Sequence, residues 1–161
     1  MAEESMRGGL PEGLASVAGF QLSKCGWWLE QRLEEELQPL GIRVRHFLVL
    51  AMLSTSGALS QQEMAGYLLL DPTLMVGLVD ELEARGLCER TRDPRDRRRY
   101  SVRITEDGLA LHHRARALAD EVGADVFGPL TDDELRTVVK AIGRVMEPFW
   151  AEQRVRPRRK R

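Results

Sequence analysis

Guanidinium and carboxylate groups are concentrated in one short stretch of the chain. The segment TRDPRDRRRY, Thr91 to Tyr100, holds five arginines and two aspartates in ten residues. Arginine binds phosphate through paired hydrogen bonds, and it also enters narrow minor grooves of DNA, where the negative potential is enhanced. A neighbouring aspartate can hold a guanidinium by the same bidentate contact. The segment therefore predicts contact with a polyanion, and a solvated loop is the alternative interpretation.

The positive charge is segregated from the rest of the chain. The formal net charge is −1. Residues 85–103 carry eight arginines against three acidic side chains, and the tail 151–161 carries six basic side chains against one acid. The remaining residues are therefore strongly acidic. An acidic body with two basic patches is typical of a protein that binds nucleic acid.

No arrangement typical of an enzyme or a metal site is present in the sequence. Phosphate-binding loops, nucleophile elbows and paired-histidine motifs are missing, so we expect neither an enzyme nor a cofactor. His112 and His113 are adjacent on a predicted helix and diverge, and Cys25 and Cys88 are far apart, so no metal is expected. The N-terminus lacks the apolar core of a signal peptide, and no segment is apolar enough to span a membrane. These features predict a cytoplasmic protein without a membrane partner.

Two short helices are predicted just before the arginine-rich segment. Ser60 followed by Glu63 is a capping box, so a helix begins there. Asp71 and Pro72 supply the N-cap and first residue of the next helix, which ends at Gly86. In that second helix, leucines recur one turn apart at Leu74, Leu78 and Leu82. Two short helices separated by a tight turn predict a helix-turn-helix.

The apolar period then changes from that of a helix to that of a strand. In residues 99–104, RYSVRI, apolar side chains alternate with polar ones, and residues 87–92, LCERTR, are the expected partner strand. Residues 93–98 of the arginine-rich segment are then the loop of this hairpin. A hairpin in this position is a wing, and we use that name for residues 87–104.

Longer helices are predicted on both sides of this unit. They cover about 16–38 and 43–54 before it, and residues after the Thr105 cap and after a second capping box at Thr131 beyond it. The terminal helices carry more apolar surface than a compact unit needs, which predicts a homodimer; cover of the monomer's own core is the alternative. The side chains expected in the dimer interface are Leu29, Leu33, Leu135, Val139, Ile142, Met146 and Phe149.

Over about residues 21–149 the chain resembles the MarR-type winged helix-turn-helix transcription regulators. The resemblance is carried by LVDELEARGL at 78–87, DPRDRRRYSVRIT at 93–105 and EDG at 106–108. It implies a mainly α fold (α+β) with long terminal dimerisation helices and a two-stranded β-wing. It also implies a homodimeric repressor that binds a palindromic operator in double-stranded DNA and is released by a small molecule, such as an aromatic or phenolic acid.

The resemblance gives the expected domain organisation. A single domain covers 16–150, with dimerisation helices at about 16–38 and 106–149 and the winged helix-turn-helix at about 43–104. Residues 1–15 are expected to form a disordered arm, and 151–161 a basic tail.

The same resemblance implies the residues that contact DNA. The wing residues are Arg95, Asp96, Arg97, Arg98 and Arg99. Asp96 and Arg98 match the family's wing aspartate and arginine, so Asp96 is expected to orient Arg98 for the minor groove. The recognition-helix residues are Asp71, Pro72, Thr73, Leu74, Val76 and Gly77. Family members usually carry serine, threonine and arginine on this face, so the sequence leaves open whether base readout depends on the wing and DNA shape or is modest.

An effector pocket is also implied. Its expected lining residues are Trp27, Trp28, Arg45, His46 and Tyr67, with a place in the core as the alternative for each. Two further functions stay open. One is a dimeric interaction protein of the same fold without specific DNA binding. The other is a thiol-based redox regulator that uses Cys25. The alternative interpretation of Cys25 is an inert, buried thiol.

Overall fold

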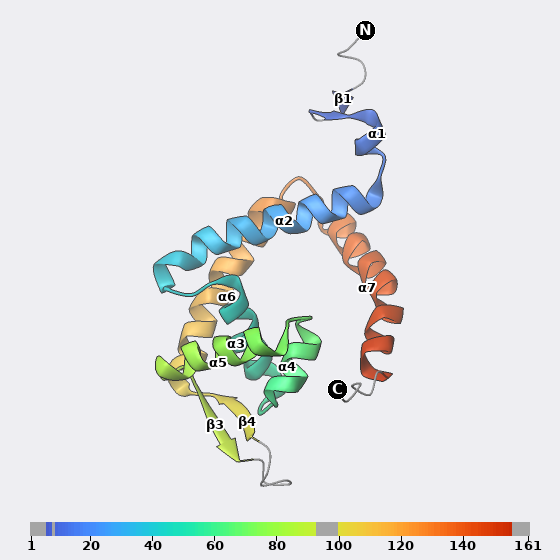
Figure 1. Cartoon of the computed structure of the whole chain (residues 1–161). Coiled ribbons are helices and arrows are strands. Elements are labelled where there is room, and N and C mark those ends of the chain that lie inside the picture. Colours follow the sequence, from blue (N-terminus) through green and yellow to red (C-terminus); the bar gives the residue numbers. More distant parts are fainter. Residues whose placement is uncertain (1–5, 8, 93–99, 156–161) are drawn as a thin grey trace.

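Six long or medium helices and one β-hairpin make up most of the structure, a computed structural model that describes residues 6–7, 9–92 and 100–155 (Figure 1). The helices of the main body are α2 Ala18–Leu37, α3 Val44–Ser56, α4 Gln61–Tyr67, α5 Pro72–Ala84, α6 Glu106–Phe127 and α7 Asp132–Val155. The hairpin strands are β3 Cys88–Arg92 and β4 Tyr100–Ile104. This mainly helical fold, with an antiparallel hairpin between α5 and α6, confirms the expected fold class.

The predicted helix starts are built by side-chain caps. The Ser60 hydroxyl accepts the Glu63 N–H at 3.2 Å, and the Glu63 carboxylate accepts the Ser60 N–H at 2.8 Å. Asp71 accepts the Thr73 N–H at 2.7 Å, and Thr105 accepts the Gly108 N–H at 3.0 Å. Each cap satisfies a backbone donor that has no partner within its helix, which is why these positions can be predicted from local sequence.

The main core lies between the helix-turn-helix and the hairpin. α3, α4, α5 and both strands contribute to it, and its fully buried side chains are Val49, Leu50, Leu53, Met64, Met75, Val79, Leu82 and Val102. A second cluster joins α2, α3 and α6 around Leu37, Phe47 and Ala115. These two clusters fix the helix-turn-helix to the α2–α6 pair.

The hairpin is extended by a short third segment. β3 and β4 pair antiparallel from Cys88 opposite Ile104 to Arg92 opposite Tyr100. On the other side of β4, the Leu59 N–H donates to the Val102 carbonyl at 3.1 Å, and the Val102 N–H donates back at 2.7 Å. The alternation expected for β4 holds only in part, because Tyr100 is 55% exposed.

The described residues near both ends of the chain include regular secondary structure. Met6–Arg7 (β1) pairs with Leu10–Pro11 (β2) around Gly9, whose positive φ of 84° allows the tight turn, and helix α1 follows at Glu12–Ala15. The last helix runs through Pro148 to Val155, beyond the predicted end at 149. Between α2 and α3, the one-turn 3-10 helix η2 spans Gln38–Leu40.

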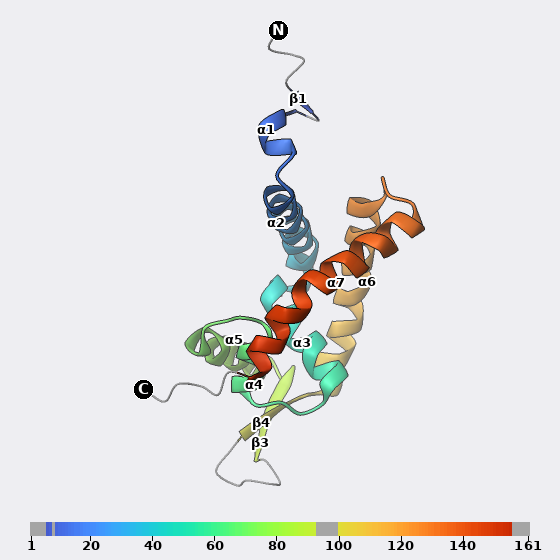
Figure 2. The ribbon, with the colours of Figure 1, turned by 90° about the vertical axis from the view of Figure 1, so that its right-hand side faces the viewer.

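α7 stands apart from the rest of the described chain. α6 packs against α2 and α3, whereas α7 makes few contacts with any other described helix or strand (Figures 1 and 2). In Figure 1, α7 leaves the turn after α6 and descends alone on the side opposite the hairpin. Within the described ranges, no helix is long and apolar enough to cross a membrane.

Candidate nucleic-acid interface

The helix-turn-helix consists of α4, the turn at residues 68–71 and α5. Leu69 in this turn has a φ of 54°, which is unusual for a residue with a side chain. The Leu70 N–H donates to the Ala65 carbonyl at 3.0 Å, which closes the turn on the end of α4. The core side chains Met75, Leu78 and Val79 then fix which face of α5 turns outward.

The outward face of the first half of α5 is largely apolar. Thr73 is exposed, Leu74 is 37% exposed and Val76 is 43% exposed, while Gly77 is half-buried. Leu74, which the family resemblance placed among the recognition-helix residues, lies at the edge of the buried stripe. The buried stripe of α5 runs through Met75, whose side chain faces the core.

The N-terminus of α5 has little capacity for a phosphate. Pro72 has no N–H group, and the N–H of Thr73 donates to the Asp71 carboxylate at 2.7 Å. A helix N-terminus binds anions through backbone N–H groups that have no other partner. Asp71 and Pro72 therefore start α5, and they leave neither of its first two backbone positions with an N–H free for an anion.

An ion-pair cluster that sequence reasoning missed joins the wing to α5. The half-buried guanidinium of Arg90, on β3, contacts the carboxylates of Asp80 and Glu83, which lie one turn apart on α5. The backbone N–H of Arg90 also donates to the Glu83 carboxylate at 2.9 Å. The wing and α5 are thereby held at a fixed angle. The spacing of the two acids, which places them one turn apart on a helix, was visible in the sequence. Nothing in the sequence indicated that both would contact Arg90.

The strand that leaves the wing is locked to the end of α5 by Thr105. Its hydroxyl donates to the Gly86 carbonyl at 2.7 Å and accepts the Gly108 N–H at 3.0 Å. Gly86 has a φ of 69°, as expected for the residue that ends α5. At Gly108 a Cβ atom would overlap the Leu87 carbonyl. The threonine and glycine of the sequence motif are thus explained by this junction.

The five wing residues expected to contact DNA, Arg95, Asp96, Arg97, Arg98 and Arg99, lie outside the described residues. In the chain, β3 ends just before that segment and β4 begins just after it; both strands lie below α5 in Figure 1.

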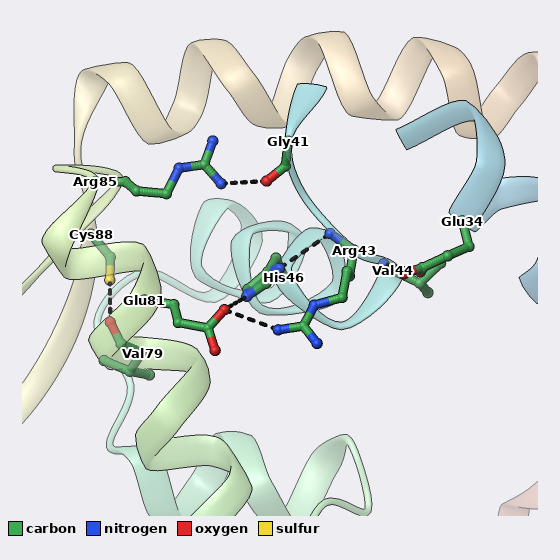
Figure 3. Close-up of polar contacts among 9 residues, drawn as sticks. All are labelled: Glu34, Gly41, Arg43, Val44, His46, Val79, Glu81, Arg85 and Cys88. Atoms are coloured by element: carbon green, nitrogen blue, oxygen red, sulfur yellow. Dashed lines mark hydrogen bonds and ion pairs between the residues drawn. The ribbon is translucent and has the colours of Figure 1, made fainter. Parts of the chain in front are cut away.

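His46 belongs to a polar cluster between α3 and α5 (Figure 3). The ring is 4% exposed, its Nδ1 accepts the Arg43 N–H at 3.1 Å, and its Nε2 lies 3.0 Å from the Glu81 carboxylate. Since Nδ1 is an acceptor, Nε2 carries the proton and donates to Glu81. The Arg43 guanidinium donates to the same carboxylate oxygen at 3.0 Å, and Arg85 donates to the Gly41 carbonyl at 2.7 Å. The cluster fixes the C-terminal half of α5 to the start of α3.

Burial lowers the pKa of His46 below its ordinary value of 6.5; Glu81 opposes this shift, and Arg43 and Arg85 add to it. On Glu81 burial acts to raise the pKa, but the hydrogen bonds and charges of Arg43 and His46 outweigh it, and the pKa is lowered. Both shifts favour a neutral imidazole beside a carboxylate.

The stability of the protein is expected to fall in mild acid because of His46. Its folded pKa is depressed, so the unfolded chain binds the proton more readily as the pH drops below 6.5. The contribution is complete above 6.5 and is lost as the pH falls toward the folded pKa. Chemical denaturation of wild type and His46→Gln between pH 7.5 and 5 should show a shallower pH slope in the variant. His112, whose pKa burial also lowers, is retained in both proteins. Equal slopes would contradict the assignment.

Of the five residues expected to line an effector pocket, one is buried and four are exposed. His46 is held in the cluster described above, whereas Trp27, Trp28 and Tyr67 are 59%, 47% and 50% exposed and Arg45 is also exposed. They come from α2, α3 and α4. A hollow on the polar side of α7 is lined by other residues: Thr137, Lys140, Gly143, Arg144, Glu147, Trp150 and Ala151.

The residues expected in a dimer interface lie on apolar faces that the described chain leaves partly or largely open. Val139 and Ile142 of α7 are 61% and 40% exposed. The half-buried members of the set are Leu29, Leu33, Leu135, Met146 and Phe149.

The two cysteines differ in their surroundings. Cys25 on α2 is half-buried, whereas Cys88 is buried, and burial together with Glu83 raises its pKa to about 11. Cys88 is therefore a protonated, unreactive thiol at neutral pH. Among the described residues, no group of three or more histidine, cysteine or acidic side chains is placed to hold a metal ion.

Comparisons with known proteins agree with this architecture. The MarR family model matches residues 42–100. The HTH-type transcriptional repressor Rv2887 of Mycobacterium tuberculosis is 32% identical over 126 residues, which cover 77% of this chain and 91% of the repressor. The crystal structure of CouR from Rhodococcus jostii RHA1 bound to p-coumaroyl-CoA is 34% identical with a TM-score of 0.76, covering 84% of this chain and 95% of CouR.

A mutant of MarR from E. coli, solved in complex with operator DNA, is 25% identical with a TM-score of 0.72 and covers 80% of this chain and 92% of that protein. The helix-turn-helix, the hairpin and the glycine-threonine junction thus occur together in a chain that is similar to these regulators over most of its length. The chain belongs to the MarR family of DNA-binding transcription regulators.

Proposed function

We propose that this chain is a homodimeric transcription repressor that binds a palindromic operator and is released by a small-molecule effector. The observation that carries the proposal is the apolar face of α7. Val138, Val139, Ile142 and Val145 are 37%, 61%, 40% and 73% exposed on a helix with no broad contact to the rest of the described chain. An amphipathic helix of this length needs a partner for its apolar face, and a two-fold dimer is the commonest form of oligomer.

Dimerisation gives the DNA-binding unit its geometry. A helix-turn-helix dimer places its two recognition helices in successive major grooves about 34 Å apart, so the operator has two related half-sites. Each α5 is fixed to its own wing by Arg90 and to α3 by His46 and Glu81. The single domain of about 16–150 that we propose would therefore move its recognition helix and wing as one unit.

The wing is proposed to contact the minor groove through Arg98, with Asp96 orienting its guanidinium. Arg98→Ala is expected to weaken operator binding by about 1–3 kcal/mol, the range for a specific arginine contact. Asp96→Ala should weaken it nearly as much although it removes a negative charge, because Arg98 loses its bidentate partner.

The control for the wing is Glu89→Ala, which removes an acid from the described base of the hairpin. It should bind slightly tighter or unchanged in a titration at fixed salt, since it loses only a general repulsion. Tighter operator binding by Asp96→Ala would rule out the orienting role.

The effector is proposed to be an aromatic carboxylic acid or its coenzyme A thioester. The support is the similarity to CouR, which was solved with p-coumaroyl-CoA, together with the exposed aromatic and basic side chains Trp27, Trp28 and Arg45. Adding p-coumaric acid and p-coumaroyl-CoA separately to a preformed operator complex tests both forms. Release by neither compound would remove this class of effector while leaving operator binding intact.

A thiol-based release mechanism through Cys25 is the second proposal for regulation, because this half-buried thiol lies on a helix expected at the dimer interface. Peroxide should then weaken operator binding by wild type and leave Cys25→Ser unaffected.

A further inference from the structure

We propose that α5 reads operator bases through the C5-methyl groups of thymine, with Leu74 and Val76 as the residues that determine specificity. The inference rests on the proposed binding to an operator, and it names the chemistry by which this recognition helix would distinguish one base pair from another.

The helix-turn-helix has no cationic side chain to offer a base. From His46 to Ala84 the chain contains no lysine or arginine, and its charged side chains are Glu63, Asp71, Asp80, Glu81 and Glu83. The first arginine after this stretch is Arg85, whose guanidinium donates to the Gly41 carbonyl at 2.7 Å. Arginine and lysine contacts to guanine are the commonest specific contacts in the major groove. The described part of α5 therefore lacks the usual means of reading G·C pairs.

What the outer face of α5 does present in its first half is largely apolar. At 100° per residue, Leu74 and Val76 lie on either side of a strip formed by Thr73 and Gly77. Both side chains are more than a third exposed. The core lies on the opposite face of α5, so packing of the core does not require apolar residues at these two positions. Thr73 is the one hydrogen-bonding side chain on this strip before Asp80.

Gly77 keeps the centre of this strip low. A Cβ atom at Gly77 would meet no other atom within 4 Å, so packing within the described chain does not require a glycine there. Glycine also weakens a helix, which makes its presence in the middle of α5 unfavourable for the isolated fold. A missing side chain on an open face instead permits close approach of a partner surface.

Among the groups in the major groove, the thymine methyl is the apolar one, and it distinguishes A·T from G·C and A·T from T·A. The second helix of a helix-turn-helix lies in that groove. The stretch from His46 to Ala84 supplies no lysine or arginine for phosphate contacts, so we infer that this helix gains its affinity from base edges. An apolar pair around a low strip thus fits two neighbouring thymine methyls better than it fits any hydrogen-bonding base edge.

The test begins with an operator selected from a random duplex pool by the full-length protein. Replacing thymine by uracil, one half-site position at a time, removes only the methyl group and keeps all hydrogen-bonding groups. At the positions facing α5, each uracil should raise the Kd about fourfold, which corresponds to burial of one methyl-sized apolar group. Uracil that leaves the Kd unchanged at every position would overturn the inference.

Variants identify the residues that contact the methyl groups. In Leu74→Ala and Val76→Ala, thymine and uracil operators should bind equally at the position that each residue contacts. Leu48→Ala is the matched control, because Leu48 is a 39% exposed leucine on α3, outside the helix-turn-helix, and it should keep the full uracil penalty. A penalty that persists in both α5 variants would place the methyl contact elsewhere.

The variant Gly77→Ala is an independent test of the inference. The added methyl has free space within the chain, so the variant should fold at least as well as wild type while binding the operator more weakly. A pool that yields no enriched sequence would instead overturn the proposed function itself and favour a protein partner for this apolar face. An enriched operator that ignores uracil overturns only the methyl readout.

Discussion

Replacing Gly108 by alanine is expected to destabilise the protein by about 3 kcal/mol, because the new methyl would overlap the Leu87 carbonyl and lie 2.9 Å from the Ile104 side chain. Gly108 is in the first turn of α6, where the cap by Thr105 holds the chain against the end of α5. The backbone must therefore shift at the junction of wing, recognition helix and α6. Thermal unfolding at one protein concentration should show Tm lowered by roughly 10 °C.

The control is Gly123→Ala on the same helix. A Cβ at Gly123 would meet nothing within 4 Å, so alanine should stabilise the helix by up to about 1 kcal/mol through its better propensity. If Gly108→Ala were as stable as Gly123→Ala, the close approach of α6 to Leu87 would not exist in solution.

Ile142→Glu is expected to convert the dimer into a monomer and to weaken operator binding at least about 100-fold. The substitution places a charge in the middle of the exposed apolar face of α7. Burying that carboxylate in an interface costs several kcal/mol, and the monomer loses the gain from two linked half-site contacts. Sedimentation velocity measures the first effect, and titration of the selected operator measures the second.

Thr137→Glu introduces the same charge on the opposite face of α7. Thr137 is exposed and lines the hollow beside this helix. This variant should remain dimeric and bind the operator normally. A soluble, fully dimeric Ile142→Glu protein would show that the interface lies elsewhere.

The features that the sequence predicted well are those that depend on neighbours in the chain. Ser60, Asp71 and Thr105 cap helices through backbone groups two or three residues away, so their types and spacing are sufficient. The hairpin followed from alternation of period two and from the turn at Gly86.

The features that it did not predict depend on distant segments. His46 and Glu81 are 35 positions apart, and only packing of α5 on α3 brings them within 3.0 Å. Gly108 was noticed as part of a motif, but its reason is the Leu87 carbonyl on a neighbouring element.

The composition of the wing was the strongest functional signal, while the recognition helix departs from what the family usually shows. A local charge pattern can indicate that a chain binds DNA, because phosphate recognition needs only positive charge in an exposed place. It cannot indicate which bases are read, since that depends on the side chains that fold and packing turn outward on α5.

The central claim, that this chain binds an operator as a homodimer, is tested most directly by the mass of the complex with a selected duplex. Sedimentation velocity of the full-length protein, titrated into a fluorescent operator at fixed salt, gives the number of chains per duplex. Our account predicts an enriched palindromic sequence and two chains on each operator duplex, with a much weaker complex on a scrambled one. A complex with one chain per duplex, or equal binding to operator and scrambled DNA, would contradict it.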